Sequence, residues 1–585
     1  MTDQTWQSAD KNVQYRIYNA IIKEHIFPDH MIVNEFEDYI ELQYHGQLLQ
    51  VDKVRKSDME RYVFRGMIRY IKGNIMMEIQ TVEQLLDVLD KQFDIPISNR
   101  LREELISSRD GFALTYDHFS HRQALIHATL KFSRMPETIN FFIWLKHFKD
   151  SEEINDLTYS ESIVVEGHPT HPLSKTKLPL TRKEVKLYAP EFEKIIPLKV
   201  MLIHKADCIT TSMEDDEQYI LNHIIPEYRY KLKAFLEPYQ FELEDYRILL
   251  VHPWQYDNVI VHQFSEWIKE GRLLPTPFDV ESKATLSFRT MTLINKPYHI
   301  KLPVNIQATS AIRTVAAVTT VDGPKLSYEL QEMLELHPQL QVALEPYGIH
   351  VNIDDDTARQ LACIVRHKPY IADNGTTLVT ASLVNKNPVD NKVVVDSYLE
   401  WIGEGPTSIA IKQFLCSYAK NLIEPLIAYI QDYGIALEAH MQNTIINLGP
   451  DYQMKFIIRD LGGSRIDLET LKLKLPHVDV TNSSLIAENI EAVIGKFQHS
   501  VIQNQIAELI HYFSKYEEVD ERALFELVGD IVDEAIDSQK AHAQVLKAVL
   551  FGPTISVKAL LRMRMENRVK QYVTIKLKNP LYKEV

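Results

Sequence analysis

The sequence has few cysteines and no long apolar run. Its only cysteines are Cys208, Cys363 and Cys416, whose spacing fits neither a disulfide framework nor a zinc ribbon. No segment approaches the ~18 consecutive apolar residues of a membrane-spanning helix, and the polar N-terminus lacks the apolar core of a signal peptide. We therefore expect a cytoplasmic protein that does not enter a membrane.

The chain also has fewer positively than negatively charged residues. The 585-residue chain has 64 Lys and Arg against 80 Asp and Glu, which gives a net charge of −16. A nucleic-acid groove needs a basic face, so this balance argues against nucleic acid as a partner. It still allows a small anionic substrate, provided that Arg and Lys are concentrated in the pocket.

Three common motifs are absent. The chain contains no GxxxxGK[ST] loop and no GxGxxG, which argues against P-loop and Rossmann nucleotide sites. It also has no GxSxG, so it lacks the nucleophile elbow of an α/β-hydrolase.

Apolar residues make up 45% of the chain, and their spacing changes along it. The N-terminal part reads mainly as helices, with helical spacing at 82–93 and 122–146 and a hairpin-like alternation at 32–51. Short strand-like runs follow, among them 199–204 and 246–251. These patterns predict an α+β fold of three parts rather than one regular α/β sheet.

Two prolines lie inside otherwise regular patterns. The apolar run 300–307 reads as a strand, and Pro303 within it indicates an edge strand or a bulge, because proline cannot donate to the ladder. Further on, 411–432 has helical spacing, and Pro425 within it is expected to kink the helix.

A predicted β-hairpin carries the first group of candidate site residues. Its strands, 435–448 and 455–461, are joined by a Gly-Pro-Asp turn. We place Glu438 and Asn443 at the start of the first strand and Asp460 at the end of the second. These oxygen ligands suit Mg²⁺, which favours a few carboxylates together with nucleotide phosphates. Acidic residues are also common at turns, so a purely structural hairpin end is the alternative.

A second group is basic and rich in hydroxyl groups. Ser287, Arg289 and Thr290 are followed by Lys301, and two Arg-Thr pairs fall within one short stretch of an acidic protein. Guanidinium groups bind carboxylate and phosphate through two hydrogen bonds, and hydroxyl groups add contacts to phosphate oxygens. The group therefore predicts a site for a triphosphate beside a polycarboxylate. Surface salt bridges are the alternative explanation.

The third group is GHPTHPLSK, residues 167–175, in which two histidines each precede a proline. The residue before a proline is held out of the helical region, so this segment reads as a rigid turn. With Lys175, the histidines predict a cationic rim for phosphate. A zinc site is the less favoured alternative, because no third His or Cys stands nearby.

In this order, the motifs resemble those of the NRPS-independent siderophore (NIS) synthetases of the aerobactin-synthetase, or IucA/IucC, type. The stretches that carry the resemblance are GHPTHPLSK (167–175), HPWQ (252–255), SFRT (287–290), KLPVNIQATSAIRT (301–314), EAHMQN (438–443), RD (459–460) and TISVKALLRMR (554–564). The chain departs from the family's motifs at three positions. It has Pro179 where the family usually has Gly, Leu286 where the family often has Ser, and Ser310 where Asn is frequent.

The resemblance implies a mostly helical thumb at 1–165, fingers with phosphate-binding motifs at 166–390, and a palm with the metal-binding hairpin at 391–585. It implies adenylation of a carboxylate, most simply of citrate or a citryl intermediate, followed by attack of an amine, with ATP and Mg²⁺ required. It further implies a homodimer, small-molecule acid and amine substrates, and an enzyme that builds a siderophore.

The resemblance also implies roles for individual residues. Catalytic roles fall to Arg289, Arg313, His440 and Lys301. The nucleotide would be bound by His171, Lys175, Ser287, Arg289, Thr290, Lys301 and Gln442. The carboxylate substrate would contact Thr309, Arg313, His440 and Lys558. The metal ligands would be Glu438, Asn443 and Asp460.

Two other functions are considered. His440, Asn443 and Asp460 loosely resemble the catalytic loop of a kinase-like phosphotransferase, although no Asp follows the histidine and no VAIK-type Lys precedes it. A non-catalytic receptor for citrate or a siderophore is the other possibility, but it would have no use for nucleotide-binding residues. The sequence does not identify the acid, the amine, or the base that deprotonates the amine.

Overall fold

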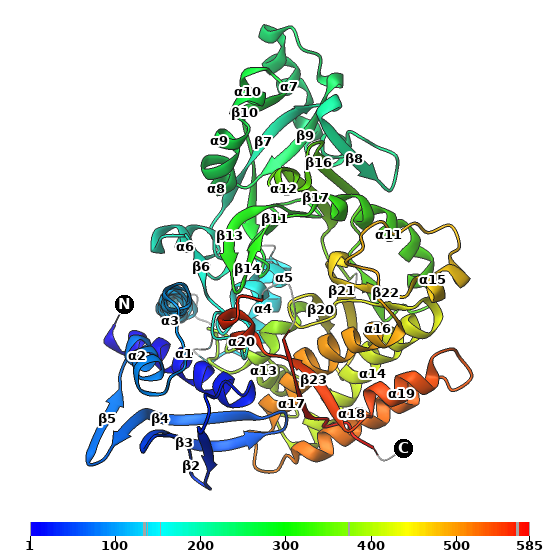
Figure 1. The fold of residues 1–585 in the computed structure, drawn as a ribbon. Coiled ribbons are helices and arrows are strands. Elements are labelled where there is room, and N and C mark those ends of the chain that lie inside the picture. The colour runs from blue at the N-terminus through cyan, green and yellow to red at the C-terminus, as the bar shows by residue number, and fades with distance from the viewer. Residues whose placement is uncertain are drawn as a thin grey trace.

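Three buried apolar clusters organise the protein in a computed structural model that describes residues 2–132, 136, 138–151, 154–371, 375–568 and 573–583. We name them after the expected parts. The thumb cluster draws mainly on residues 9–113, the fingers cluster mainly on 180–365, and the palm cluster on 130–164 and 326–581. In Figure 1 the fingers lie at the top, the thumb at the lower left and the palm at the lower right.

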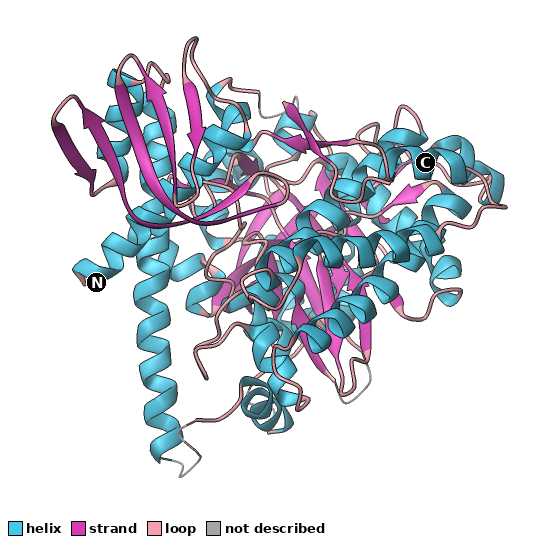
Figure 2. Ribbon diagram, turned by 90° about the horizontal axis from the view of Figure 1, so that it is seen from below, coloured by secondary structure: helices cyan, strands magenta, loops and turns pink. Residues whose placement is uncertain are grey.

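The thumb contains more β structure than its sequence suggested. Its five strands form an antiparallel sheet in chain order, which Figure 2 shows as a curved layer next to helices. The alternation at 32–51 is therefore the first part of a meander rather than an isolated hairpin. The elements are α1 (Asp3–Lys23), β1 (Ile32–Glu35), β2 (Tyr39–Tyr44), β3 (Gln47–Ser57), β4 (Arg61–Lys72), β5 (Ile75–Ile79), α2 (Val82–Gln92) and α3 (Asn99–Phe132).

The fingers are built on an eight-stranded sheet with the order β8-β16-β17-β12-β11-β10-β7-β9. The two strands predicted at 199–204 and 246–251 are present and pair with each other in antiparallel fashion. The strands are β7 (Ile196–His204), β8 (Cys208–Ser212), β9 (Tyr246–Val251), β10 (Leu273–Ala284), β11 (Thr290–Leu293), β12 (Tyr298–Lys301), β16 (Tyr347–Val351) and β17 (Ala362–His367). Helix α11 (Ala317–Glu335) packs against β16.

The prediction of a single strand at 300–307 is wrong, because these residues belong to two strands. The chain leaves β12 at Lys301 and starts β13 (Val304–Ala308) in a different sheet, in which β13 lies between β14 (Ala311–Arg313) and β6 (Lys177–Leu178). Pro303 lies at the break. It has no N–H to donate, so the hydrogen-bonded ladder of β12 cannot continue through it. The break carries the chain from the large sheet towards the other two parts.

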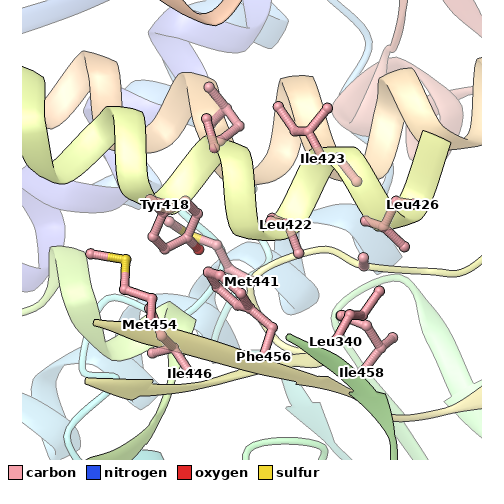
Figure 3. Close-up of a cluster of buried hydrophobic side chains, with 14 of the residues drawn as sticks. Leu340, Tyr418, Leu422, Ile423, Leu426, Met441, Ile446, Met454, Phe456 and Ile458 are labelled. Carbon is pink, nitrogen blue, oxygen red and sulfur yellow. The ribbon is translucent and has the colours of Figure 1, made fainter. Parts of the chain in front are cut away.

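The palm joins a four-stranded sheet to several helices. Its order is β15 (Leu340–Val342), β21 (Met454–Ile458), β20 (Thr444–Leu448) and β18 (Thr376–Val379), and β20–β21 is the predicted hairpin. Helix α14 (Ser408–Tyr433) packs Tyr418, Leu422 and Leu426 over this sheet (Figure 3). This spacing places the three side chains on one face of the helix. The helix contains Pro425 and ends at Tyr433, and Gly434, whose φ is +65°, caps it.

Other helices complete the palm. The helix expected at 122–146 is interrupted, because α3 ends at Phe132 and α4 begins at Phe141. A nine-residue π-helix, η10, follows directly on α16; such segments are rare and often occur at functional sites. The elements are α4 (Phe141–Asp150), α5 (Asp156–Ser162), α13 (Val394–Trp401), α15 (Leu468–Lys474), α16 (Ile490–Phe497), η10 (Gln498–Ile506), α17 (Ala507–Phe513), α18 (Glu521–Ala535), α19 (Ala543–Leu550), β23 (Thr554–Lys558), α20 (Leu560–Met565) and β24 (Thr574–Lys578). Within the described ranges, no helix combines the length and apolar character needed to cross a membrane.

Candidate active site

A cavity of about 430 Å³ lies where thumb, fingers and palm meet. This volume is within the range of small-molecule sites in proteins. Nine of the residues that were assigned a site role from the sequence line it, although they come from segments up to several hundred residues apart. They are His171, Lys175, Ser287, Thr309, Arg313, Glu438, His440, Gln442 and Lys558.

Asp460 and Lys301 form an ion pair outside the residues that line this cavity. Lys301 Nζ lies 2.6 Å from Asp460 Oδ1, and Arg366 Nη2 lies 3.6 Å from the same oxygen. Burial alone would raise the pKa of Asp460, but Lys301, Arg366 and Arg289 together hold it far below its ordinary value. The carboxylate is therefore ionised at neutral pH, which a metal ligand requires.

Two arginines of the fingers lie close enough to the acidic residues of the palm for their charges to interact. The pKa of Arg289 is lowered by burial and raised by the charge of Asp460. The pKa of Arg313 is lowered to about 10 by burial and by Arg289, while Asp460 and Glu438 act in the opposite direction. Both guanidinium groups remain charged at neutral pH. The structure thus brings the basic group and the hairpin group together.

Arg313 is held so that one donor of its guanidinium group, the N–H at Nε, remains available to a ligand. Its Nη2 donates to Thr309 Oγ1 at 2.9 Å and to the Ala308 carbonyl at 3.1 Å. Its Nε is buried and has no hydrogen-bond partner among the described residues, as is also true of Nε of Arg289. Buried donors are rarely left unpaired in native proteins, so these atoms indicate a ligand that accepts hydrogen bonds.

Backbone strain is concentrated around the same groups. Phe288, Thr309 and Asp460 have φ values of 65°, 57° and 74°. Such values are unfavourable for residues other than glycine, most of all for a bulky or β-branched side chain. Strained residues of this kind cluster at functional sites, where the surrounding structure maintains them. Here they re-orient the chain beside the predicted Ser287, Arg289, Thr309 and Lys301 groups.

The segment 167–175 lines the cavity but does not form the cationic rim that the sequence predicted. Burial, together with Arg16 and Arg313, lowers the pKa of His171 to about 3, and that of His168 also lies well below its ordinary value. Lys175 Nζ pairs with Glu191 at 2.5 Å. The histidines are therefore neutral and the lysine is compensated. His171 retains a buried Nε2 without a partner among the described residues, which suits a hydrogen bond to a ligand.

The hairpin group also differs in one detail from the prediction. Strand β20 begins at Thr444, so Glu438 to Asn443 form a loop before the strand rather than its first residues. Glu438 Oε1 pairs with Lys496 Nζ at 2.5 Å, and this lysine lowers the pKa of Glu438 against the effect of burial. Burial lowers the pKa of His440, which is thus a neutral imidazole at neutral pH.

The turn that contains Leu286 and Ser287 is fixed by the palm. The Leu286 N–H donates to the Glu161 carboxylate, and its carbonyl accepts a hydrogen bond from Gln442 Nε2 at 3.1 Å. Glu161 in turn pairs with Arg459 at 2.7 and 3.1 Å. The backbone of residue 286 makes these bonds, so the departure from Ser to Leu leaves the turn anchored. Thr290 completes it with a hydrogen bond of 3.3 Å to Ser287 Oγ.

Lys558 reaches the cavity from strand β23, next to the π-helix. Burial lowers its pKa, while Glu438 raises it. Gln503 of η10 donates to the Ser556 carbonyl at 2.9 Å and lies 3.1 Å from His499 Nδ1, so the π-helix supports the strand that carries Lys558.

Several site residues were missed by sequence reasoning. Glu161, Arg366 and Lys496 lie in helices or a strand without a motif, and each pairs with a charged residue that is distant in sequence. His499 lies in the π-helix and lines the cavity. The nine-residue π-helix also marks the site, but it can be recognised only in the three-dimensional structure and not in the sequence. A single Glu or Lys on a helix has no pattern that separates it from a surface residue.

Comparison with known families covers most of the chain after the thumb. Residues 156–385 match the IucA / IucC family. Residues 412–573 match the family described as ferric iron reductase FhuF-like transporter. The two matches together span the fingers and palm residues that surround the cavity.

Individual proteins are similar over nearly the whole length. The chain is 59% identical over 580 residues to staphyloferrin A synthase of Staphylococcus aureus (strain NCTC 8325 / PS 47), which covers 99% of each chain. It is 29% identical over 560 residues to D-ornithine--citrate ligase of that strain, covering 88% of this chain and 82% of the relative. The ATP-bound aerobactin synthetase IucA of a hypervirulent Klebsiella pneumoniae pathotype has a TM-score of 0.80 and 18% identity, covering 98% of this chain and 100% of that one. That likeness confirms the predicted α+β fold.

Proposed function

The chain belongs to the IucA / IucC family of siderophore synthetases, and from this we propose that it is an ATP-dependent ligase that joins citrate, or a citryl intermediate, to an amine. Its relatives are citrate ligases and siderophore synthases, which favours ligation over a kinase-like transfer or a binding role. The observation that carries the proposal is the convergence of Arg313, Lys558 and Glu438 on one cavity.

In the first step, a carboxylate oxygen of the acid attacks the α-phosphorus of ATP. The bond between the α-phosphorus and the bridging oxygen breaks, and pyrophosphate leaves with the electron pair. Carboxylates are weak nucleophiles, so orientation and neutralisation of charge are the main contributions of the protein. We assign the orientation of the acid to Arg313, Thr309 and Lys558, and the neutralisation of the phosphates to Arg289 and Lys301.

Asp460, Asn443 and Glu438 would hold Mg²⁺ together with the nucleotide phosphates. Asp460 Oδ1 contacts Lys301 and Glu438 Oε1 contacts Lys496, whereas no hydrogen bond from a described residue to the second oxygen of either carboxylate is present. Mg²⁺ takes six ligands and usually keeps several waters, so phosphate oxygens and waters would supply the remaining positions. When bound, the ion neutralises charge on the phosphates.

In the second step, the neutral amine attacks the acyl carbon. The bond from that carbon to the phosphate oxygen breaks, AMP leaves with the electron pair, and the nitrogen loses a proton. His440 lines the cavity, and burial lowers its pKa so that its imidazole is neutral. The unprotonated ring nitrogen can accept that proton.

The products separate this proposal from its rivals. With ATP, Mg²⁺, citrate and a panel of amines, we expect AMP and pyrophosphate in equal amounts together with an amide. A kinase-like transferase would release ADP, and a receptor would consume no ATP. Exchange of citrate for 2-oxoglutarate or succinate identifies the acid, since only the correct acid supports pyrophosphate release.

The metal assignment predicts a specific defect for Asp460→Asn. Loss of an ionised ligand should raise the Mg²⁺ concentration needed for half-maximal pyrophosphate release by about 10- to 100-fold or more. The matched control is Asp451→Asn, at the exposed turn of the same hairpin, which should leave the Mg²⁺ dependence unchanged. An unaltered Mg²⁺ dependence in a folded Asp460→Asn variant would contradict the assignment.

Two further expectations remain proposals. The boundaries of thumb, fingers and palm at 1–165, 166–390 and 391–585 can be tested by producing each segment alone and measuring whether it folds. Because residues 130–164 pack into the palm cluster, the first segment should lose stability when it is separated from the third. The homodimer can be tested by light scattering of the purified chain, which should give twice the mass of 67.9 kDa.

A further inference from the structure

Arg16 of helix α1 connects the thumb to the segment that carries His168 and His171. Its side chain is only 9% exposed, and the residue belongs to the cavity lining. The guanidinium group lies over Phe112 of α3, with Cζ 4.9 Å from the ring centroid. The proposed reaction assigns no role to Arg16, although a buried cation with five N–H donors is costly unless each donor finds an acceptor.

Each of the five N–H groups of Arg16 has an acceptor. Nη1 donates to the His168 carbonyl and, at 3.3 Å, to the His171 carbonyl. Nη2 donates at 3.1 Å to both the carbonyl and the carboxylate Oε2 of Glu166, and Nε donates to Asn12 Oδ1. One planar group thus holds three backbone carbonyls of a single turn, a geometry that the one nitrogen of a lysine cannot reproduce.

Glu166, at the start of this turn, is fixed by the thumb as well. Asn12 Nδ2 donates to its Oε2 at 2.6 Å, and the Tyr116 hydroxyl donates to its Oε1 at 2.9 Å. Its backbone N–H donates to Asn385 Oδ1 at 2.9 Å. The place of the turn in the cavity wall therefore depends on α1 and α3, two helices of the thumb.

The ring of His171 has one nitrogen bound within the turn and the other without a protein partner. The Leu173 N–H donates to Nδ1 at 3.1 Å, so in the neutral ring the proton is on Nε2. This Nε2–H is buried and has no acceptor among the described residues. The ring lines the cavity together with Ser287 of the predicted phosphate-binding group. A phosphate oxygen of the nucleotide would supply the acceptor.

We propose that Arg16 is a positioning residue of the nucleotide site, which holds the turn 166–171 so that His171 Nε2–H meets a phosphate of ATP. Arg16 uses its donors on protein groups, so it acts on the nucleotide through His171. The inference rests on the proposed ligase function, because ATP is the ligand concerned. It gives the thumb a part in ATP binding beside the fingers and the palm.

The first variant is Arg16→Lys. It keeps a positive charge beside Glu166 but loses most of the carbonyl contacts, so the turn is no longer fixed. We expect the Kd for ATP, measured by isothermal titration calorimetry, and KM for ATP in pyrophosphate release to rise together by about 10-fold. Because the lost interaction binds ground state and transition state alike, kcat at saturating ATP and KM for citrate should change less than about threefold.

A double-mutant cycle with His171→Ala tests whether Arg16 acts through this histidine. His171→Ala alone should raise the Kd for ATP about 10- to 100-fold, the effect of losing a charge-assisted hydrogen bond. In the His171→Ala background, Arg16→Lys should add less than about twofold, since the group that it positions is gone. Equal losses in both backgrounds would show a general structural role and would overturn the proposal.

The matched control is Arg109→Lys. Arg109 lies in α3 of the thumb, its side chain is 11% exposed, and it pairs with Asp10, Glu83 and Asp110, but it is outside the cavity lining. Its replacement should lower the thermal midpoint and leave the Kd for ATP within about twofold of the wild type. A Kd raised as much as in Arg16→Lys would mean that any damage to the thumb weakens ATP binding, and the specific role would be lost.

Asn12→Ala keeps the proposal testable if Arg16→Lys does not fold. It removes the acceptor of Arg16 Nε and one donor to Glu166, and should raise the Kd for ATP about threefold, but not in the His171→Ala background. Unchanged ATP affinity in the folded variants, with normal binding by the wild type, would overturn this inference alone. A wild-type protein that neither binds ATP nor releases pyrophosphate would overturn the ligase function, and this inference with it.

Discussion

Replacement of Arg313 by alanine should abolish measurable citrate-dependent pyrophosphate release while the protein remains folded. Arg313 projects from the fingers into the cavity, and Thr309 and the Ala308 carbonyl fix its orientation. Loss of a single preorganised charge-stabilising donor typically lowers kcat by about 10²- to 10³-fold. Because Arg313 also binds the acid in our assignment, KM for citrate should rise as well.

Stability should respond differently from activity. Arg289 destabilises the charged form of Arg313, and the buried Nε of Arg313 has no partner among the described residues. Removal of this cation therefore relieves a repulsion, and the thermal midpoint should be unchanged or slightly higher. The conservative change Arg313→Lys keeps the charge but loses the planar fork, so its activity should lie between those of the wild type and the alanine variant.

A matched control distinguishes a specific effect from a general one. Arg229 is an exposed arginine in α7 (Arg229–Leu236) of the fingers, far along the chain from the cavity lining. Arg229→Ala should retain full pyrophosphate release. Near-normal release by Arg313→Ala, measured at saturating citrate and ATP, would remove Arg313 from the mechanism and leave the acid without its main ligand.

Breaking the buried pair between Glu161 and Arg459 should cause the largest loss of stability. The two side chains are only 1% and 2% exposed and form two parallel contacts of 2.7 and 3.1 Å. Removing one partner leaves the other charge buried and uncompensated, which typically costs about 3–5 kcal/mol. This is a large part of the total stability of a typical protein, about 5–15 kcal/mol. Urea unfolding of Glu161→Leu and Arg459→Met measures the loss.

The double variant supplies the decisive comparison. With both charges replaced by apolar side chains, no buried charge remains unpaired, so Glu161→Leu/Arg459→Met should be more stable than either single variant. The exposed pair of Arg522 and Glu526 on α18 is the control, and Glu526→Gln should change the free energy of unfolding by less than about 1 kcal/mol. Single variants as stable as the wild type would contradict the structural role of the pair.

The same pair should also influence the nucleotide site. Glu161 accepts from the Leu286 N–H, and Arg459 donates to the Gln442 carbonyl at 2.8 Å, so both hold the turn that contains Ser287. The double variant should thus recover stability but keep a raised KM for ATP. This separation between stability and nucleotide binding would show that the pair positions the turn.

Motif order alone was sufficient to identify the family and the α+β fold. Short patterns such as 167–175 and 438–443 require particular residue types at particular spacings, so they remain recognisable in the linear sequence. Local rules also predicted α14 and the β20–β21 hairpin, because helical periodicity and turn residues act over a few positions. The break at Pro303 was foreseeable in kind, since proline lacks an N–H, but not in its consequence, a change of sheet.

Charge states and partners were decided only by the tertiary structure. The sequence suggested a cationic His168, His171 and Lys175 rim, whereas burial makes the histidines neutral and Glu191 compensates the lysine. Burial and long-range electrostatics depend on which distant segments pack together, and a linear pattern contains no record of that packing.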